Sequence, residues 1–446
     1  MDWISPRVCR SAGMAAGVTV LLLLSPDRVA ADPPQEPAAP AGAEVRVARL
    51  IKDLAASDFT TRNSAHEQLS KLGSKSRQQL QQALTDPDPE VRLRAGRLLE
   101  RLKLDDLWAA GRVTVRAAGE PASKILVAMA EQSGNHIHVG DPYGTFAEEK
   151  IDAEYSGACY WEAVDDVCRR TGNRLRPHYD THTPGVVVSS GAPGDYPRAY
   201  SGPVRAQITS AKRHFVEELS YEERRSELAH SFHVNLQFNW EDRFRIVGYA
   251  TQPELVEGVT DNHVIISAAQ PSGGGWNATS PGLRQVTASL KLNPIPVSAA
   301  SLTVFTIKWG LIAVGEPATL EIADLQPGKL HSQDDVAVKI ESVEKQAAGK
   351  YIVTVNVLRD LAMPDPYEIV FREYDVQLID RHDQPFRVQS QTPALTERGV
   401  QLRITYHGES TESEPKLLKL QYPRLRARRD LHLTFKNVPL PVGKPE

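Results

Sequence analysis

Short segments that alternate apolar and polar residues fill the second half of the chain and constrain its fold most strongly. Turn residues separate them, as in antiparallel sheets that bury one face. The pattern predicts a β-rich domain over 204–325 and a β-sandwich-like domain over 327–446, with a boundary near 326. A charged segment, 216–230, is expected to form one helix or a long loop. The expected strands are 204–208, 233–238, 244–247, 264–266, 286–292, 302–307, 336–340, 351–357, 367–378, 400–406, 417–422 and 431–435.

The segment 44–107 has helical spacing and an internal repeat. Leu54, Asp58, Arg62, Ala65, Leu69 and Leu72 recur thirty residues later as Leu84, Asp88, Arg92, Ala95, Leu99 and Leu102. Asp and Pro residues at 86–89 break one helix and begin the next. The segment resembles HEAT-type helical repeats, most clearly at 86–99. The resemblance implies a protein-interaction surface, and a purely structural helical cap is the alternative.

Over 112–190 the spacing of apolar residues switches several times between the strand period and the helix period. It predicts the order β-α-β-β-α-β-β, with helices that stop at Ser133-Gly134 and Thr171-Gly172. Residues 129–134 and 161–172 resemble the short N-terminal domain of secretins and TonB-dependent receptors. The resemblance implies a periplasmic contact module without catalytic residues. The whole chain is thus predicted to be multidomain α+β: a short helical-repeat unit, a small β-α-β-β-α-β domain and an antiparallel β-sandwich-like region.

Residues 1–31 have the features of a secretory signal peptide. Arg7 and Arg10 precede an apolar run over 12–24, and Ala31 ends a small-residue cleavage pattern. The run is shorter than the ~20 residues that span a bilayer, so cleavage is favoured over an uncleaved anchor. A Pro/Ala-rich linker follows at 32–43. The mature chain is predicted to be exported to the periplasm or cell envelope without a transmembrane segment.

Export makes a disulfide chemically feasible, and Cys9 would leave with the signal peptide. Cys159 and Cys168 would lie ~13 Å apart within one helix, too far to bond. Two separate buried thiols are expected, and a disulfide requires that Cys159 lie outside the helix and fold back.

Histidines at alternate positions offer a candidate metal site. His136 and His138 share one face of a predicted strand, and His178 and His182 share a face of a later segment. If the two segments were neighbours, their imidazoles would suit Zn²⁺ or Cu²⁺. The alternative is a polar strand face with incidental histidines.

Two further features are candidate binding residues. Trp276 lies in a glycine-rich loop at 272–282, and Arg424, Arg426 and Arg428 would share one face of an extended segment. The arginines would suit an anionic partner, either an envelope polysaccharide or a lipid headgroup, and Trp276 could line a groove for a polysaccharide. A flexible hairpin loop and a solvated sheet edge are the alternatives.

The net charge and the absence of known motifs indicate the functional class of the protein. With 52 basic and 56 acidic residues the net charge is −4, so the chain has no electrostatic footprint for nucleic acid. No catalytic motif and no cofactor motif is found. We therefore expect an exported, non-enzymatic binding or scaffold protein of the bacterial cell envelope that contacts an envelope protein. A metal-assisted hydrolase and an envelope-polysaccharide-binding protein are the alternatives.

Overall fold

The computed structural model is mixed α+β and is dominated by strands in antiparallel sheets. It describes residues 41–140, 146, 148–176, 185–191, 196–220, 225–269, 274–279, 282–334, 336–359, 374–396 and 399–441. The predicted signal peptide and most of the linker lie outside these residues. The chain divides into two compact units, 1–96 and 97–446.

The first unit is helical. Its helices are α1 (Ala41–Asp53), α2 (Phe59–Leu72), α3 (Arg77–Gln82) and the start of α4 (Pro89–Trp108), with short 3₁₀ turns at Gly73–Ser76 and Ala83–Thr85. Asp58 caps α2 by accepting the Thr61 N–H at 2.8 Å, and its repeat partner Asp88 accepts the Glu90 N–H at 2.8 Å. These bonds pair backbone donors at helix starts that have no intrahelical acceptor.

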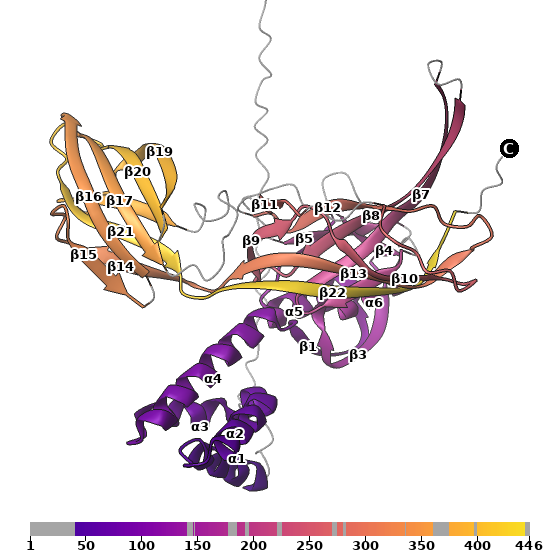
Figure 1. Ribbon diagram of the computed structural model, residues 1–446, viewed down its shortest axis with the longest axis horizontal. Helices are drawn as coiled ribbons and strands as arrows, with labels where there is room; N and C mark the ends of the chain where they lie inside the picture. Colours follow the sequence, from indigo (N-terminus) through magenta and orange to yellow (C-terminus); the bar gives the residue numbers. More distant parts are fainter. Residues whose placement is uncertain are drawn as a thin grey trace, which may run out of the picture. The chain divides into compact units, whose positions relative to one another are not determined.

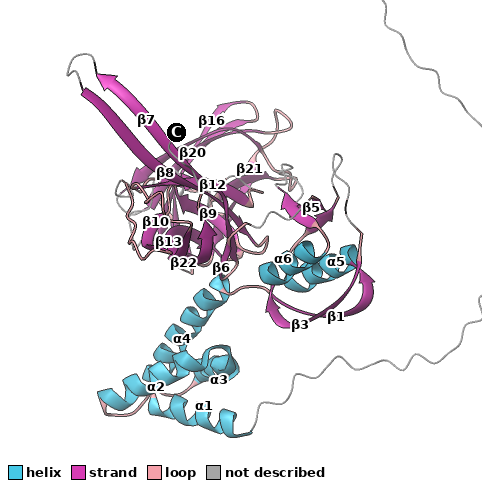
Figure 2. Cartoon of the chain, turned by 90° about the vertical axis from the view of Figure 1, so that its right-hand side faces the viewer, coloured by secondary structure: helices cyan, strands magenta, loops and turns pink. Residues whose placement is uncertain are grey.

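A small α+β domain begins the second unit. Its elements are β1 (Arg112–Pro121), α5 (Ala122–Ser133), β2 (Ile137–Val139), β3 (Lys150–Cys159), α6 (Tyr160–Arg170), β4 (Asn173–Arg176) and β5 (Val186–Ser190). Strand β1 pairs with β3, and β5 pairs with β2 and β4. Helices α5 and α6 lie between the two small sheets (Figure 2). Helix α5 ends at Gly134, whose φ of 70° suits a residue without a Cβ.

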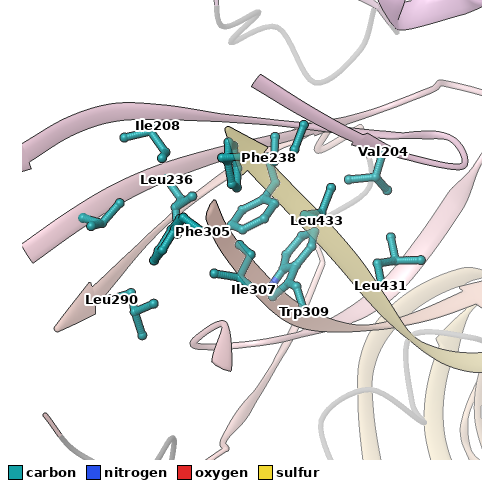
Figure 3. Close-up of a cluster of buried hydrophobic side chains, with 14 of the residues drawn as sticks. Val204, Ile208, Leu236, Phe238, Leu290, Phe305, Ile307, Trp309, Leu431 and Leu433 are labelled. Atoms are coloured by element: carbon teal, nitrogen blue, oxygen red, sulfur yellow. The ribbon is translucent and has the colours of Figure 1, made fainter. Parts of the chain in front are cut away.

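The next strands form two facing sheets. Strands β6 (Arg198–Ser201), β7 (Val204–Ser220), β8 (Arg225–Trp240) and β12 (Gln285–Leu292) form one sheet in the order β12-β8-β7-β6. The other contains β9 (Arg245–Ala250), β10 (Glu254–Thr260), β11 (Trp276–Ala278), β13 (Ser301–Val314) and β22 (Arg426–Pro439). Apolar side chains of both sheets meet in one core (Figure 3), where the rings of Phe238 and Trp309 stack with centroids 3.9 Å apart. We call these sheets the first sandwich.

The prediction of a helix or loop over 216–230 was wrong. Residues 216–220 and 225–230 extend β7 and β8 into a long hairpin, with Val216 opposite Ala229 (Figure 1). In this hairpin the backbone N–H and C=O groups of β7 pair with those of β8. The charged sequence pattern of 216–230 does not indicate such a pairing. The predicted strand 264–266 is also absent, since Ile265 makes only an isolated bridge to Val259.

A second sandwich has its own core. It contains β14 (Pro317–Ile322), β15 (Leu330–Gln333), β16 (Val336–Ala347), β17 (Lys350–Arg359), β18 (Asp375–Asp380), β19 (Arg387–Thr396), β20 (Gly399–His407) and β21 (Pro415–Pro423). Its sheets are β14-β21-β18 and β15-β16-β17-β20-β19. The Tyr406 hydroxyl joins them by donating to the Val376 carbonyl at 2.7 Å. Residues 367–373 of the predicted strand 367–378 lie outside the described residues.

The last strand, β22, belongs to the first sandwich rather than the second. It pairs with β13 from Ser301–Pro439 to Val314–Arg426, and Leu431, Leu433 and Phe435 enter the first core. The segment 327–446 therefore supplies strands to two cores, and β14 lies before the boundary expected near 326. The second sandwich is inserted between β13 and β22, a long-range pairing that local alternation cannot reveal.

Candidate functional site

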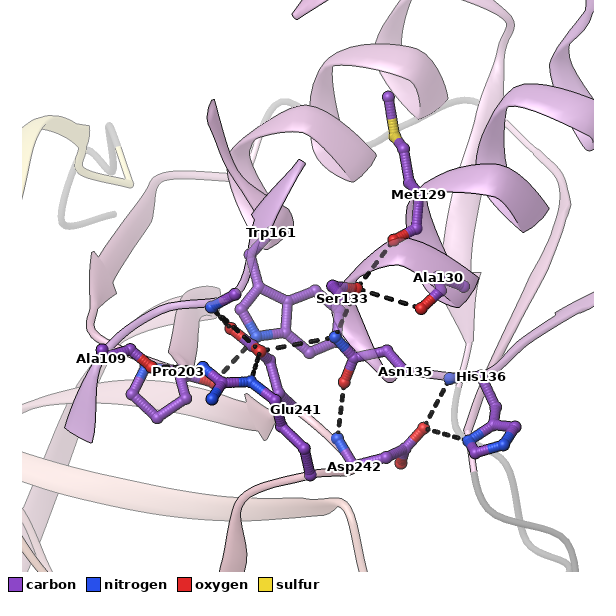
Figure 4. A network of polar contacts seen from close by, with 12 residues as sticks. Ala109, Met129, Ala130, Ser133, Asn135, His136, Trp161, Pro203, Glu241 and Asp242 are labelled. Atoms are coloured by element: carbon purple, nitrogen blue, oxygen red, sulfur yellow. Dashed lines mark hydrogen bonds and ion pairs between the residues drawn. The ribbon is translucent and has the colours of Figure 1, made fainter. Parts of the chain in front are cut away.

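Polar contacts attach the α+β domain to the first sandwich (Figure 4). The Glu241 side chain is fully buried and accepts the Gly111 N–H at 2.8 Å and Arg243 Nε at 2.7 Å. Asp242 accepts the His136 N–H at 2.8 Å and Arg284 Nε at 2.9 Å. Both carboxylates therefore have charged or backbone donors, as buried acids require.

A second junction joins α6 to the sheet β12-β8-β7-β6. Arg205 on β7 donates to Asp165 on α6 through Nε at 2.6 Å and Nη2 at 2.9 Å, and both side chains are buried. The Tyr200 hydroxyl donates to the same carboxylate at 2.8 Å. Burial and the Asp165 carboxylate raise the pKa of Tyr200, so this hydroxyl remains a donor at neutral pH.

A cavity of about 280 Å³ opens beside this ion pair. We call it the arginine groove. Helix α6, strand β4 and the strands β6, β7 and β8 supply its walls. It is lined by Asp165, Cys168, Asn173, Arg174, Leu175, Arg176, Tyr196, Arg198, Arg205, Gln207, Thr209 and Gln237. Four arginines and one carboxylate are among these residues, and that carboxylate already binds Arg205. The groove thus has an excess of positive charge along its described lining.

Two of the arginines carry buried donors without an acceptor. Arg174 and Arg176 lie at alternate positions of β4, and the Nε atom of each is buried with no hydrogen-bond partner in the described structure. A buried donor left unbonded costs ~1–3 kcal/mol. A guanidinium presents a planar fork of donors that matches a carboxylate or phosphate. The groove therefore has the charge and the donors for an anionic ligand group.

No protein-family model matches this chain. No curated protein sequence matches it significantly either. Across the described residues, no helix is long and apolar enough to cross a membrane. In the same residues, no group of three or more His, Cys, Asp or Glu side chains lies close enough to hold a metal ion.

The predicted metal ligands divide between the described and undescribed parts of the chain. His136 is largely exposed, and its Nδ1 lies 3.2 Å from Oδ2 of Asp242. His138 lies two residues further along β2. His178 and His182 lie outside the described residues, so their pairing with β2 stays a prediction.

The structure brings two predicted binding residues together. The Arg428 guanidinium lies 4.5 Å from the centre of the Trp276 ring. The ring also lies against Gly310, where a Cβ atom would come within 3.0 Å of it. Trp276 is therefore a half-buried part of the sheet surface that Arg428 covers, and it is not an open stacking platform for a sugar.

The other two predicted arginines flank the start of β22. Arg424 is 3.7 Å from Asp334, and Arg426 begins β22 opposite Val314. Because Arg426 and Arg428 alternate within β22, these two share a strand face, whereas Arg424 precedes the strand.

Both thiols are free as expected, but only Cys168 is buried, whereas Cys159 is half-buried. Cys159 immediately precedes α6, and the buried Cys168 lies within it and lines the arginine groove. Burial, with a contribution from Asp165, raises the pKa of Cys168 to about 12.

The groove arginines were not predicted from the sequence. The available signal was the alternation of Arg174 and Arg176 in a predicted strand, which places both on one face. Arg198 on β6 and Arg205 on β7 come after the α+β domain in the sequence, so their convergence on α6 depends on the tertiary fold.

Proposed function

We propose that this protein is an exported, non-enzymatic binding protein of the bacterial cell envelope that recognises acidic groups in the arginine groove. The observation that carries the proposal is the groove lining itself, in which four arginines, Arg174, Arg176, Arg198 and Arg205, meet a single carboxylate. A bound carboxylate or phosphate would supply the negative charge that this lining lacks, and guanidinium groups bind both.

The chemistry of the groove supports binding rather than catalysis. Its carboxylate, Asp165, is held by Arg205 and Tyr200. Its thiol, Cys168, has a pKa of about 12 and stays protonated at neutral pH. Neither group is therefore a ready base or nucleophile, while the arginines remain charged.

The wider role follows from the sequence. The signal-peptide pattern at 1–31 supports export. The HEAT-like segment 44–107 and the secretin/TonB-like segment 112–190 support contacts with an envelope protein. The β-rich segments complete the proposed order of helical repeats, α+β domain and sandwich-like region. On this basis the groove recognises the ligand and the helical segment contacts the protein partner.

The test compares anion binding by the wild-type chain and an Arg174→Gln/Arg176→Gln variant. Calorimetric titration with glucuronate and with inorganic phosphate at low ionic strength should detect binding to the wild type. The variant should bind at least ~10-fold more weakly, because two charged donors are lost. Arg403→Gln, an exposed change on β20, is the matched control and should bind as the wild type does. Equal affinity of wild type and double variant, or no anion binding by the wild type, would contradict the proposal.

A further inference from the structure

The arginine groove opens onto an extended polar face of the sheet β12-β8-β7-β6. Alternate residues of β8 point into the first core, including Phe232, Val234, Leu236 and Phe238. The intervening residues point to the opposite face, as strand pleating requires. On β7, β8 and β12 that face carries Gln207, Ser210, Lys212, His214, Ser231, His233, Asn235, Gln237, Gln285, Thr287, Ser289 and Lys291.

Amide and hydroxyl side chains continue the face away from the groove. Gln237, which lines the groove, donates to Gln285 Oε1 on the neighbouring strand at 3.1 Å. Two residues further along β8, Asn235 donates to Ser210 Oγ at 2.8 Å. Thr287 and Ser289 on β12 are exposed beside them. This middle part of the face is uncharged and rich in hydrogen-bonding groups.

A cationic cluster lies at the far end of the face. Lys212, His233 and Lys291 are directly opposite one another on three adjacent strands. The His214 ring lies 5.3 Å from the His233 ring. His233 is four residues from Gln237 along β8, or ~14 Å. The sheet therefore carries positive charge at two separated places with a neutral polar surface between them.

We propose that this face binds a linear acidic polysaccharide, with one acidic sugar in the arginine groove and another at the cluster of Lys212, His214, His233 and Lys291. The inference rests on the proposed function of the groove. A charged sugar chain matches both ends, and its hydroxyl groups match the amides and hydroxyls between them. In the described part of the face, no apolar side chain stands between the two ends to hold an acidic peptide.

The histidines make the far end sensitive to pH. Desolvation lowers the pKa of His233, and electrostatic repulsion from His214, Lys291 and Lys212 lowers it further. Lys212 and His214 face it from β7 and Lys291 from β12, so all three neighbours are basic residues. A bound carboxylate opposes this effect and favours the protonated imidazole. Binding should therefore strengthen as the pH falls below the usual histidine pKa of about 6.5, where carboxylates remain ionised.

The experiment measures the affinity of the full chain for an oligogalacturonate of about ten sugars at pH 7.5 and pH 5.5. Affinity for the oligomer should rise roughly tenfold at the lower pH. A His214→Gln/His233→Gln variant should lose this rise and keep its affinity for monomeric glucuronate in the groove. His382→Gln, an exposed change in the second sandwich, should keep the rise.

The outcomes separate this inference from the proposed function. If glucuronate binds through Arg174 and Arg176 but the oligomer binds no more tightly, the extended site is wrong and the groove stands. A pH effect that persists without His214 and His233 also overturns the extended site. Polyglutamate or polyphosphate binding as tightly as the oligogalacturonate overturns the assignment to a polysaccharide. If no anion binds at all, both proposals fail.

Discussion

Arg62 and Arg92 stand thirty residues apart and make the same pair of hydrogen bonds. Each guanidinium donates through Nη1 to the carbonyl oxygens five and six residues before it, at distances of 2.6 to 2.9 Å. Each arginine thus closes the loop that leads into its own helix, α2 or α4. The sequence repeat is therefore also a repeat of local hydrogen bonding.

Replacing Arg92 with Gln should loosen the loop before α4. We expect a loss of about 1 kcal/mol, because two exposed hydrogen bonds from a charged donor are removed. Hydrogen exchange of the amides of Asp86, Asp88, Glu90, Val91 and Arg92 should become faster. Arg97→Gln, on the exposed surface of the same helix, is the control. Unchanged exchange in the Arg92 variant would show that the repeated contact does not hold the loop.

Asp165→Asn should strongly destabilise the junction between α6 and β7. It leaves the buried Arg205 without its carboxylate, and breaking a buried pair from one side costs about 3–5 kcal/mol. The double variant Asp165→Asn/Arg205→Met removes the uncompensated charge and should unfold at a higher temperature than Asp165→Asn. Thermal unfolding measures both.

An exposed ion pair provides the comparison for that series. Asp383 lies 2.8 Å from Lys416, and Asp383→Asn should cost less than about 1 kcal/mol. If Asp165→Asn were as mild as this control, Arg205 would have another source of compensation.

Gly111→Ala should disturb the contact between the α+β domain and the first sandwich. A Cβ atom there would lie 2.6 Å from Oε2 of Glu241, the carboxylate that accepts the Gly111 N–H. Limited proteolysis should then cut near residue 111 faster than in the wild type. At Gly274 a Cβ atom meets nothing within 4 Å, so Gly274→Ala should leave the cleavage rate unchanged. Equal cleavage of the two variants would mean that the junction adapts to the methyl group.

The two thiols should differ in reactivity. Burial raises the pKa of both, and that of Cys168 reaches about 12. Iodoacetamide at pH 8 should therefore modify the half-buried Cys159 slowly and leave Cys168 intact, because the thiolate is the reactive form. Peptide mass spectrometry measures the extent of modification at each cysteine. In urea, where the chain is unfolded, both cysteines should react at the same rate. Rapid modification of Cys168 in the native protein would place it outside a buried environment.

Elements with strong local signals lie where the sequence predicts them. Helix α5 ends at Gly134 because glycine accepts the left-handed conformation of a helix stop. Asp58 begins α2 because its carboxylate pairs a helix-start donor, and that bond lowers its pKa. The β7–β8 hairpin was missed because its charged tip carries no local strand signal.

The candidate site was less predictable than the elements that build it. The Trp276–Arg428 contact joins residues that the sequence marked separately, because the Trp276 ring reaches Gly310 on β13, the strand that pairs with β22. The arginine groove was not predicted, since its walls come from strands and a helix that lie far apart along the chain.

The sequence by itself determined the periods of the helices and strands, their caps, and the places where one pattern replaces another. These features depend on residues within a few positions of one another, which a local pattern records. Only the tertiary structure decided that β22 joins the first core, that Arg205 meets Asp165, and that four arginines share one groove. Each of these depends on partners dozens of residues away, whose meeting is determined by strand pairing and the burial of the apolar core.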